Sequence, residues 1–265
     1  MTENTNNTGK LAINIMYDGT KYCGWQVQKN AVSVQGRMQD ALEELLGFRP
    51  DVSGVSRTDS GVHANNYVCH ISAEGVNIPP ERLANALNAH LHGSGIAVKK
   101  AILIDNDFHA RYSCIKKEYV YKIWNAPYMN PFYEGKAMYF PYKIDEAKLT
   151  FLEGEFVGSH DFTAFMSKGS KITEDTVRTV EYFKYERDGD LLNIYVCADG
   201  FLYNMVRIMA GTFIAAHRTQ IKPGDVTKAL AEKNRGAVGD TAPAEGLYLN
   251  RIWYGEPYEH ISAII

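Results

Sequence analysis

One carboxylate, Asp59, lies in a stretch of small residues that would suit a reactive loop. The stretch runs from Ser53 to Ala64 and reads SGVSRTDSGVHA, with Arg57 two residues before the aspartate. Glycine and small hydroxyl residues interrupt the apolar pattern, which predicts a strand end that passes into a tight loop. Such a loop can present a carboxylate to a cleft as a nucleophile. Taken alone, Thr58-Asp59-Ser60-Gly61 is more often an ordinary turn whose aspartate bonds to the backbone.

A second group of residues combines basic and aromatic side chains. It comprises FHARY at 108–112, which contains Arg111, and KKEYVY at 116–121, which contains Tyr119. Nucleic-acid sites need this combination, because a base stacks on a ring while Lys or Arg meets phosphate. An amphipathic strand with exposed lysines at one end would give the same pattern.

The third feature is an arginine inside an apolar helix. The sequence GFLYNMVRIMAG at 200–211 surrounds Arg207 with apolar residues. A guanidinium in such surroundings usually needs a carboxylate partner. Asp59 is a candidate partner, and an ion pair would hold its carboxylate ionised and oriented, as a nucleophile requires.

The first part of the chain is predicted to supply four strands and two helices. Alternating apolar residues predict a half-buried strand from Leu11 to Tyr17, and helical spacing predicts a helix from Val34 to Leu46. Further strands are expected at 52–57, 67–71 and 96–104, with a second helix that opens at Pro79-Pro80 and runs to Leu91. This β-α-β-β-α-β order is that of a ferredoxin-like layer.

The second part can be parsed in the same order. The pattern predicts a strand at 119–123, a helix at 144–156, a hairpin of 177–185 and 191–197 joined at Asp188-Gly189, helices at 201–216 and 225–232, and a final strand at 247–254. The expected fold class is therefore α+β, with two ferredoxin-like (split β-α-β) halves whose antiparallel sheets join side by side. Helices would cover one face, and the active-site cleft would run between the halves. The expected domains are a disordered tail at 1–9, an N-terminal domain at 10–105 that carries Asp59, and a C-terminal domain at 106–265.

The composition is that of a soluble globular protein, with 45% hydrophobic and 22% charged residues. The polar start of the chain does not have the pattern of a signal peptide. A membrane span needs about 18 consecutive apolar residues, and every apolar run in the sequence is shorter. We therefore expect a cytoplasmic protein without membrane contact. The four cysteines form no C-x-x-C pair and the eight histidines show no ligand spacing. Neither a disulfide framework nor a metal site is expected. Because the net charge is -3, any contact with RNA would have to use local basic patches.

In their order and spacing, these segments together resemble the TruA family of tRNA pseudouridine synthases. The resemblance covers the chain from Leu11 to Tyr254 and rests on RTDSGVHA at 57–64, FHARYS at 108–113, KEYVYKIWN at 117–125 and GFLYNMVR at 200–207. It implies that Asp59 is the catalytic aspartate, that Tyr119 stacks on the target base, and that Arg207 pairs with Asp59. Arg57 matches an arginine that helps to turn the target nucleotide out of the helix, and Arg111 is a further candidate for substrate binding.

The resemblance also implies an activity. The family converts uridine to its C-glycoside isomer at positions 38, 39 and 40 in the anticodon stem-loop of tRNA, without cofactor or metal, and as a homodimer. A base in a stem must first be flipped into the cleft. The aspartate then attacks the sugar or the base, or acts as the base of a glycal route, and the sequence leaves these routes open. Ser56 and Ser60 stand where many members have glycine and alanine, and we expect these small replacements to change loop packing rather than chemistry.

Two other classes of function compete with this interpretation. A non-catalytic RNA-binding protein built on two ferredoxin-like modules would also use exposed aromatics, although the K/R-G-F/Y-G/A-F-V-x-F/Y signature of such proteins is absent from the sequence. A hydrolase based on two carboxylates would need a second acid close to Asp59, for which the sequence offers Asp161 in SHDFTAF.

Overall fold

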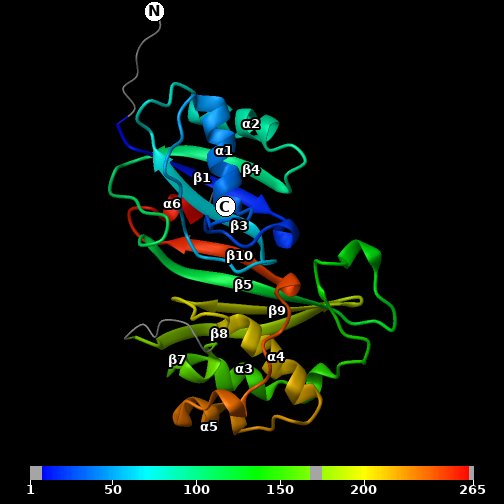
Figure 1. Ribbon diagram of the computed structural model, residues 1–265. Coiled ribbons are helices and arrows are strands. Elements are labelled where there is room, and N and C mark those ends of the chain that lie inside the picture. The colour runs from blue at the N-terminus through cyan, green and yellow to red at the C-terminus, as the bar shows by residue number, and fades with distance from the viewer. Residues whose placement is uncertain (1–7, 168–174, 263–265) are drawn as a thin grey trace, which may run out of the picture. The chain divides into compact units, whose positions relative to one another are not determined.

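The structure is a computed structural model that describes residues 8–167 and 175–262 (Figure 1). The protein divides into two compact units. Unit 1 combines Met1–Ile115 with Leu249–Ile265, and unit 2 is Lys116–Tyr248. The predicted disordered tail, 1–9, lies outside the described residues apart from Thr8 and Gly9. No helix within the described ranges is both long and apolar enough to cross a membrane.

Unit 1 is a sheet with two helices on one face. Its elements are β1 (Lys10–Tyr17), η1 (Gly19–Lys21), α1 (Val34–Leu46), β2 (Ser53–Gly54), β3 (His63–Ser72), α2 (Pro80–His90), β4 (Ile96–Ile104), most of β10 (Leu247–Tyr254), and α6 (Glu259–Ser262). The strand order is β4-β1-β3-β10, and β1 pairs antiparallel with both β3 and β4. In Figure 1 the helices α1 and α2 lie together over the strands of this unit.

The core of unit 1 follows from the alternation in β1. Leu11, Ile13 and Ile15 point to one face and are fully buried, as are Met38 of α1 and Leu83 of α2. Side chains alternate between the two faces of a strand, so this one face supplies the apolar surface that both helices cover.

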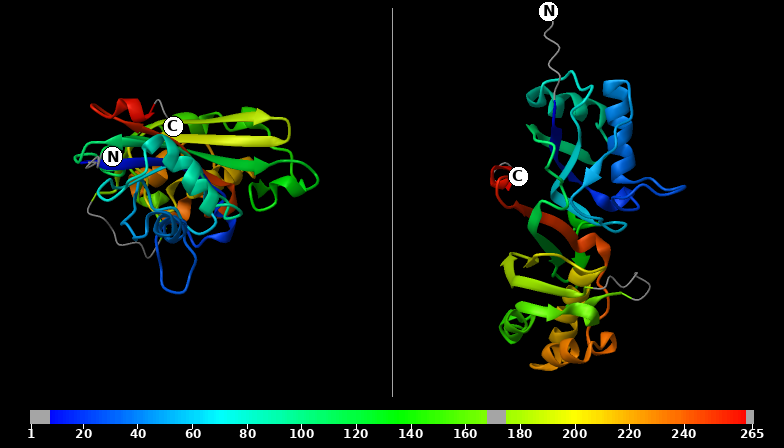
Figure 2. Two further views of the ribbon diagram at one scale, coloured as in Figure 1. Left: turned by 90° about the horizontal axis from the view of Figure 1, so that it is seen from above. Right: turned by 90° about the vertical axis from the view of Figure 1, so that its left-hand side faces the viewer.

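The strands of unit 2 are also mostly antiparallel, and longer segments connect them. Its elements are β5 (Cys114–Trp124), η2 (Pro131–Tyr133), β6 (Met138–Tyr139), η3 (Glu146–Lys148), α3 (Phe151–Phe156), β7 (Gly158–Asp161), η4 (Phe162–Phe165), β8 (Val177–Asp188), β9 (Leu191–Ala198), α4 (Met205–His217), α5 (Asp225–Glu232), η5 (Arg235–Ala237) and η6 (Ala244–Gly246). The strand order is β5-β9-β8-β7, with antiparallel pairing throughout, and β6 adds to β5 in parallel. Figure 2 shows the same elements from two further sides.

Aromatic contacts fix the helices of unit 2 on its sheet. The ring of Phe156 in α3 lies 4.7 Å from that of Phe183 in β8, and the ring of Tyr185 lies 5.3 Å from that of Phe213 in α4. Because Phe183 and Tyr185 are two positions apart in one strand, α3 and α4 cover the same face.

Most of the predicted elements are confirmed. The helices at 34–46 and 225–232 and the strands at 96–104 and 247–254 have the predicted bounds, and the α+β class with mostly antiparallel strand pairing is confirmed. The hairpin of β8 and β9 also forms, with its turn at Gly189 and Asp190. The strand at 67–71 is longer than predicted and begins at His63, whereas the one at 52–57 is reduced to Ser53–Gly54.

Two predicted helices begin later than expected. The helix at 144–156 has α geometry only from Phe151, since Asn125 Oδ1 accepts the backbone N–H of Ile144 and holds the preceding chain against β5. The helix at 201–216 begins at Met205, because Asn204 takes the left-handed conformation (φ 63°) and ends the turn before it.

Candidate active site

The Asp59 loop connects β2 to β3 in unit 1 and is held by its neighbours on both sides of the aspartate. The backbone N–H of Trp25 donates to Thr58 O at 3.1 Å, and that of Gly61 donates to Tyr22 O at 3.2 Å. The Asp59 side chain is half-buried. The segment at 22–25 therefore fixes the backbone from which the carboxylate projects.

This close approach requires glycine at position 24. Gly24 has a φ of 100°, and a Cβ there would lie 2.3 Å from Thr58 O. Any side chain would thus push the two segments apart, besides adopting a conformation that L-residues avoid.

Aromatic residues support the loop from beneath. The hydroxyls of Tyr17 and Thr58 are hydrogen bonded at 2.8 Å, and Tyr67, stacked on Trp25 at 4.2 Å, donates its hydroxyl to Ser56 O. Ser60 Oγ donates to Tyr22 O at 3.3 Å. The Ser60 hydroxyl therefore takes part in loop packing.

Two candidate substrate-binding residues, Arg57 and Arg111, also belong to unit 1. Both side chains are exposed, Arg57 in the Asp59 loop and Arg111 in the connection between β4 and β5. The backbone N–H of Arg111 donates to His109 Nδ1 at 3.1 Å, which fixes the chain there while its side chain stays at the surface. Exposed guanidinium groups of this kind can meet RNA phosphates.

Arg207 lies in the first turn of α4 in unit 2, where two acceptors orient its half-buried guanidinium. Nε donates to Ala242 O at 2.8 Å, and Nη1 donates to Asn204 Oδ1 at 2.7 Å. Asn204 is itself fixed, because its Nδ2 donates to Ser167 Oγ at 2.8 Å. The arginine is thus held in one orientation by a backbone carbonyl and a side-chain amide.

Tyr119 and Tyr121 point to the same face of β5. Tyr119 is 6% exposed, and its ring meets that of Phe201 edge-on, with centroids 5.0 Å apart. Tyr121 is fully buried and donates its hydroxyl to Pro243 O at 2.8 Å. Burial raises the pKa of Tyr121 well above its usual value, against the opposing effect of the positive Arg207 nearby. Tyr121 therefore stays a neutral hydrogen-bond donor beside Arg207.

The structure brings some of the predicted residues together within each unit. Asp59 and Arg57 share one loop of unit 1, whereas Tyr119 and Arg207 both belong to unit 2. The ion pair between Asp59 and Arg207 stays a prediction. Sequence reasoning did not assign roles to Asn204 or to the backbone of 242–243, although the Gly- and Pro-containing stretch GDTAPAEG is typical of a loop that approaches other backbone closely.

Asp161, the second acid that a hydrolase would need, has a structural role. It accepts hydrogen bonds from Thr163 and Thr176 and forms an ion pair with Lys233 at 2.7 Å. Burial alone would raise the pKa of Asp161, but these hydrogen bonds and Lys233 outweigh it and hold the pKa well below the usual range. This carboxylate is occupied in capping η4, which gives the hydrolase alternative no support.

The family comparison identifies a class of RNA-modifying enzymes. The chain belongs to the tRNA pseudouridine synthases, whose family model it matches over residues 13–113 and 154–255. These ranges contain Asp59 and Arg207, while Tyr119 lies between them. Among its relatives is tRNA pseudouridine synthase A of Ruminiclostridium cellulolyticum, 39% identical over 246 residues, which cover 92% of this chain and 99% of that protein. The proteins of the same name from Thermoanaerobacter sp. (strain X514) and Bacillus pumilus are 40% and 39% identical, again over 92% of this chain and 99% of theirs.

Proposed function

We propose that this protein isomerises uridine to pseudouridine in the anticodon stem-loop of tRNA, at positions 38, 39 and 40, with Asp59 as the reactive group. The observation that carries the proposal is the family motif RTDSGVHA on a loop whose backbone is bonded on both sides of the carboxylate. A reaction is accelerated most when the protein holds the reacting group in position before the substrate arrives. The similarity to the tRNA pseudouridine synthases over nearly the whole chain supports the same conclusion.

In the proposed reaction the glycosidic bond from C1′ to N1 of the flipped uridine breaks, and the uracil turns. A new bond joins C1′ to C5, the proton on C5 is lost to a base, and N1 takes up a proton from solvent, so the product is an isomer of the substrate. Asp59 serves as the nucleophile on the sugar or the base, or as the base of a glycal route. Arg207, oriented by Ala242 O and Asn204 Oδ1, pairs with Asp59 and keeps it ionised.

The proposed architecture places this chemistry between two ferredoxin-like halves whose sheets join side by side. Tyr119 stacks on the target base. Since its ring is only 6% exposed and lies against Phe201, this stacking requires Phe201 to move when the base enters. The proposal includes a cytoplasmic homodimer, which sedimentation equilibrium would detect as a mass of twice 29.7 kDa.

Replacement of Asp59 by asparagine tests the assignment. We expect Asp59→Asn to bind tRNA with nearly unchanged affinity but to release no tritium from tRNA labelled at C5 of uridine, because the amide is neither nucleophile nor base. Asp161→Asn is the matched control and should retain turnover. Full turnover by Asp59→Asn would exclude the assignment, and stoichiometric binding without conversion of excess tRNA by the wild type would favour the non-catalytic RNA-binding alternative.

A further inference from the structure

The segment Gly239–Ala242 crosses α4 next to Arg207, and we infer that this crossing positions the Arg207 guanidinium for the reaction, with Thr212 and Arg235 as its supporting residues. The inference rests on the proposed function, in which Arg207 orients the reactive carboxylate. Neither Thr212 nor Arg235 would contact substrate, so both would be positioning residues.

The segment and the helix are in direct backbone contact. A Cβ on Gly211 would lie 1.7 Å from Asp240 O, so only glycine allows this approach. Thr212, fully buried at the next position, accepts the backbone N–H of Gly239 at 3.0 Å and donates its hydroxyl to Ile208 O at 2.8 Å. One side-chain hydroxyl thus links the crossing segment to the helix, and without it the buried Gly239 N–H would lack this acceptor.

The same crossing reaches both the backbone and the side chain of Arg207. The backbone N–H of Ala242 donates to Arg207 O at 3.1 Å, and Ala242 O accepts from Arg207 Nε at 2.8 Å. The helix that carries Arg207 therefore also binds, one turn further on, the segment that orients its guanidinium. If the segment shifts, the acceptor of Nε shifts with it.

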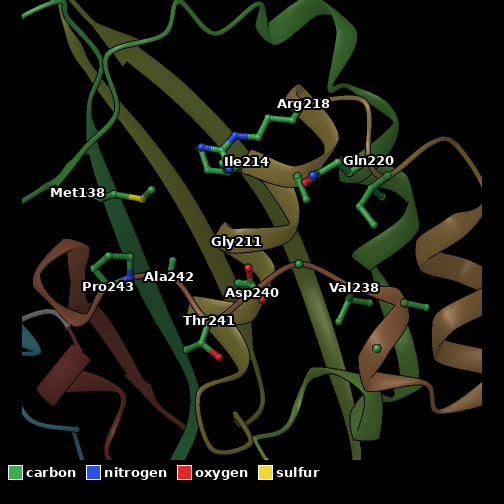
Figure 3. Close-up of a pocket in the computed structure, with 15 residues that line it drawn as sticks. Met138, Gly211, Ile214, Arg218, Gln220, Val238, Asp240, Thr241, Ala242 and Pro243 are labelled. Atoms are coloured by element: carbon green, nitrogen blue, oxygen red, sulfur yellow. The ribbon is translucent and has the colours of Figure 1, made fainter.

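Support for the segment is concentrated at this crossing. Beyond Gly211 the segment and the C-terminal half of α4 diverge around a pocket of about 410 Å³, lined by residues 236–243 on one side and by Ile214, Ala215 and Arg218 on the other (Figure 3). Arg235 of η5 also contacts the segment, because it donates to Gly239 O at 2.9 Å and to Thr241 Oγ1 at 3.3 Å. The Thr212 hydroxyl and the Arg235 fork are thus two defined supports beside an open space.

A paired substitution separates positioning from stability. Thr212→Val keeps the shape of the side chain but removes the acceptor of Gly239 N–H, whereas Thr212→Ser keeps the hydroxyl. We expect Thr212→Val to lower kcat about 10-fold or more with KM nearly unchanged, since a misplacement of about 1 Å at a reacting group can cost on the order of 100-fold. Thr212→Ser should restore most of the rate. Phe213→Leu, which weakens packing of the same helix on β8, should lower stability without this loss of kcat.

A double-mutant cycle tests whether Thr212 acts through Arg207. In an Arg207→Lys background, Thr212→Val should cause little further loss of kcat, because the group that it positions is already gone. Equal losses in both backgrounds, or an equal loss from Phe213→Leu, would overturn the inference. A wild-type protein that converts no tRNA would instead overturn the proposed function. Exchange of the Arg207 Nε–H measured by NMR needs no activity: it should be slow in the wild type and faster in Thr212→Val, and equal rates would again overturn the inference.

Discussion

Tyr121 and Tyr139 both donate a hydrogen bond to a proline carbonyl, but the two hydrogen bonds differ in burial. The Tyr121 hydroxyl bonds to Pro243 O next to Ala242 and is deeply buried, whereas Tyr139 bonds to Pro127 O at 2.9 Å near the surface. We expect Tyr121→Phe to lower the free energy of unfolding by about 1 kcal/mol, because the hydrogen bond from the buried Tyr121 side chain to Pro243 O is lost, and to lower kcat several-fold. Tyr139→Phe should change stability by less than about 0.5 kcal/mol. Urea denaturation of both variants, with tritium release as the activity assay, checks this, and equal effects would contradict it.

A buried histidine gives unit 1 a pH dependence. His70 Nδ1 accepts the backbone N–H of Ala110 at 3.2 Å, and burial, with His109 and Lys10 nearby, lowers the pKa of His70 to about 4. In the unfolded chain a histidine takes up its proton near pH 6.5, so below that pH the unfolded state binds more protons than the folded one. The contribution of neutral His70 to the free energy of unfolding should therefore be fully present above about pH 6.5. It should fall by roughly 2 to 3 kcal/mol as the pH drops towards about 4.

Urea midpoints measured at pH 7 and pH 4.5 check this prediction, with His70→Gln as the comparison. Glutamine can still accept from Ala110 N–H but does not titrate in this range. The variant should lose a large part of the difference between the two midpoints, while His109, whose pKa burial also lowers, supplies some of what is left. An unchanged difference in the variant would show that another group is responsible.

The position of the Asp59 loop depends on the connecting segment at 22–25. Substitutions at two glycines, Gly24 and Gly47, test this dependence. Gly24 and Gly47 both have positive φ, but a Cβ on Gly24 would meet Thr58 O whereas a Cβ on Gly47 would meet nothing within 4 Å. Gly47→Ala should therefore cost only the backbone strain of about 1 to 2 kcal/mol. Gly24→Ala should cost more and, because it displaces the loop, should lower kcat by at least about 10-fold. Comparable activity of the two variants would show that the loop tolerates the shift.

Elements with strong periodicity could be predicted from the sequence because burial on one face repeats at a fixed spacing. The helix at 34–46 has this repeat and ends at Gly47, which adopts the left-handed conformation with a φ of 81°. The start of α4 could not be predicted, since apolar residues continue through 201–203 and only the backbone of Asn204 ends the turn. Hydrophobicity alone does not record such a local change in φ.

The candidate side chains of the site stand out in the sequence, whereas the contacts that support them do not. Asp59, Tyr119 and Arg207 are chemically distinctive and stand in recognisable motifs. Ala242, in contrast, acts through its backbone carbonyl, which every residue type carries, and Thr212 bonds to Gly239 across a separation of 27 positions. Such contacts depend on how distant segments pack, so a single sequence gives no signal for them.

For the whole molecule, charge limits how tRNA can be bound. The net charge of -3 and the pI near 6.2 give no general attraction for a polyanion, so affinity must come from a few cations placed at the contact. Arg57 and Arg111 are exposed, and each lies in a segment fixed by backbone hydrogen bonds. A cation carried by a fixed backbone loses less conformational entropy on binding than a cation on a mobile loop. This difference favours Arg57 and Arg111 as phosphate contacts.

The dependence of tRNA affinity on salt concentration measures how many such phosphate contacts the protein makes. Each phosphate neutralised by a protein cation adds roughly 0.7 to 0.9 to the slope of log K against log salt concentration. Arg57→Ala and Arg111→Ala should each reduce the slope by about this amount and weaken binding to all tRNAs alike, as filter binding from low to high salt would show. Lys228→Ala is the control, because Lys228 lies in α5 with Glu232 as its ion-pair partner. If Arg57→Ala leaves the slope unchanged but lowers kcat, Arg57 acts on the flipped nucleotide rather than as an anchor for phosphate.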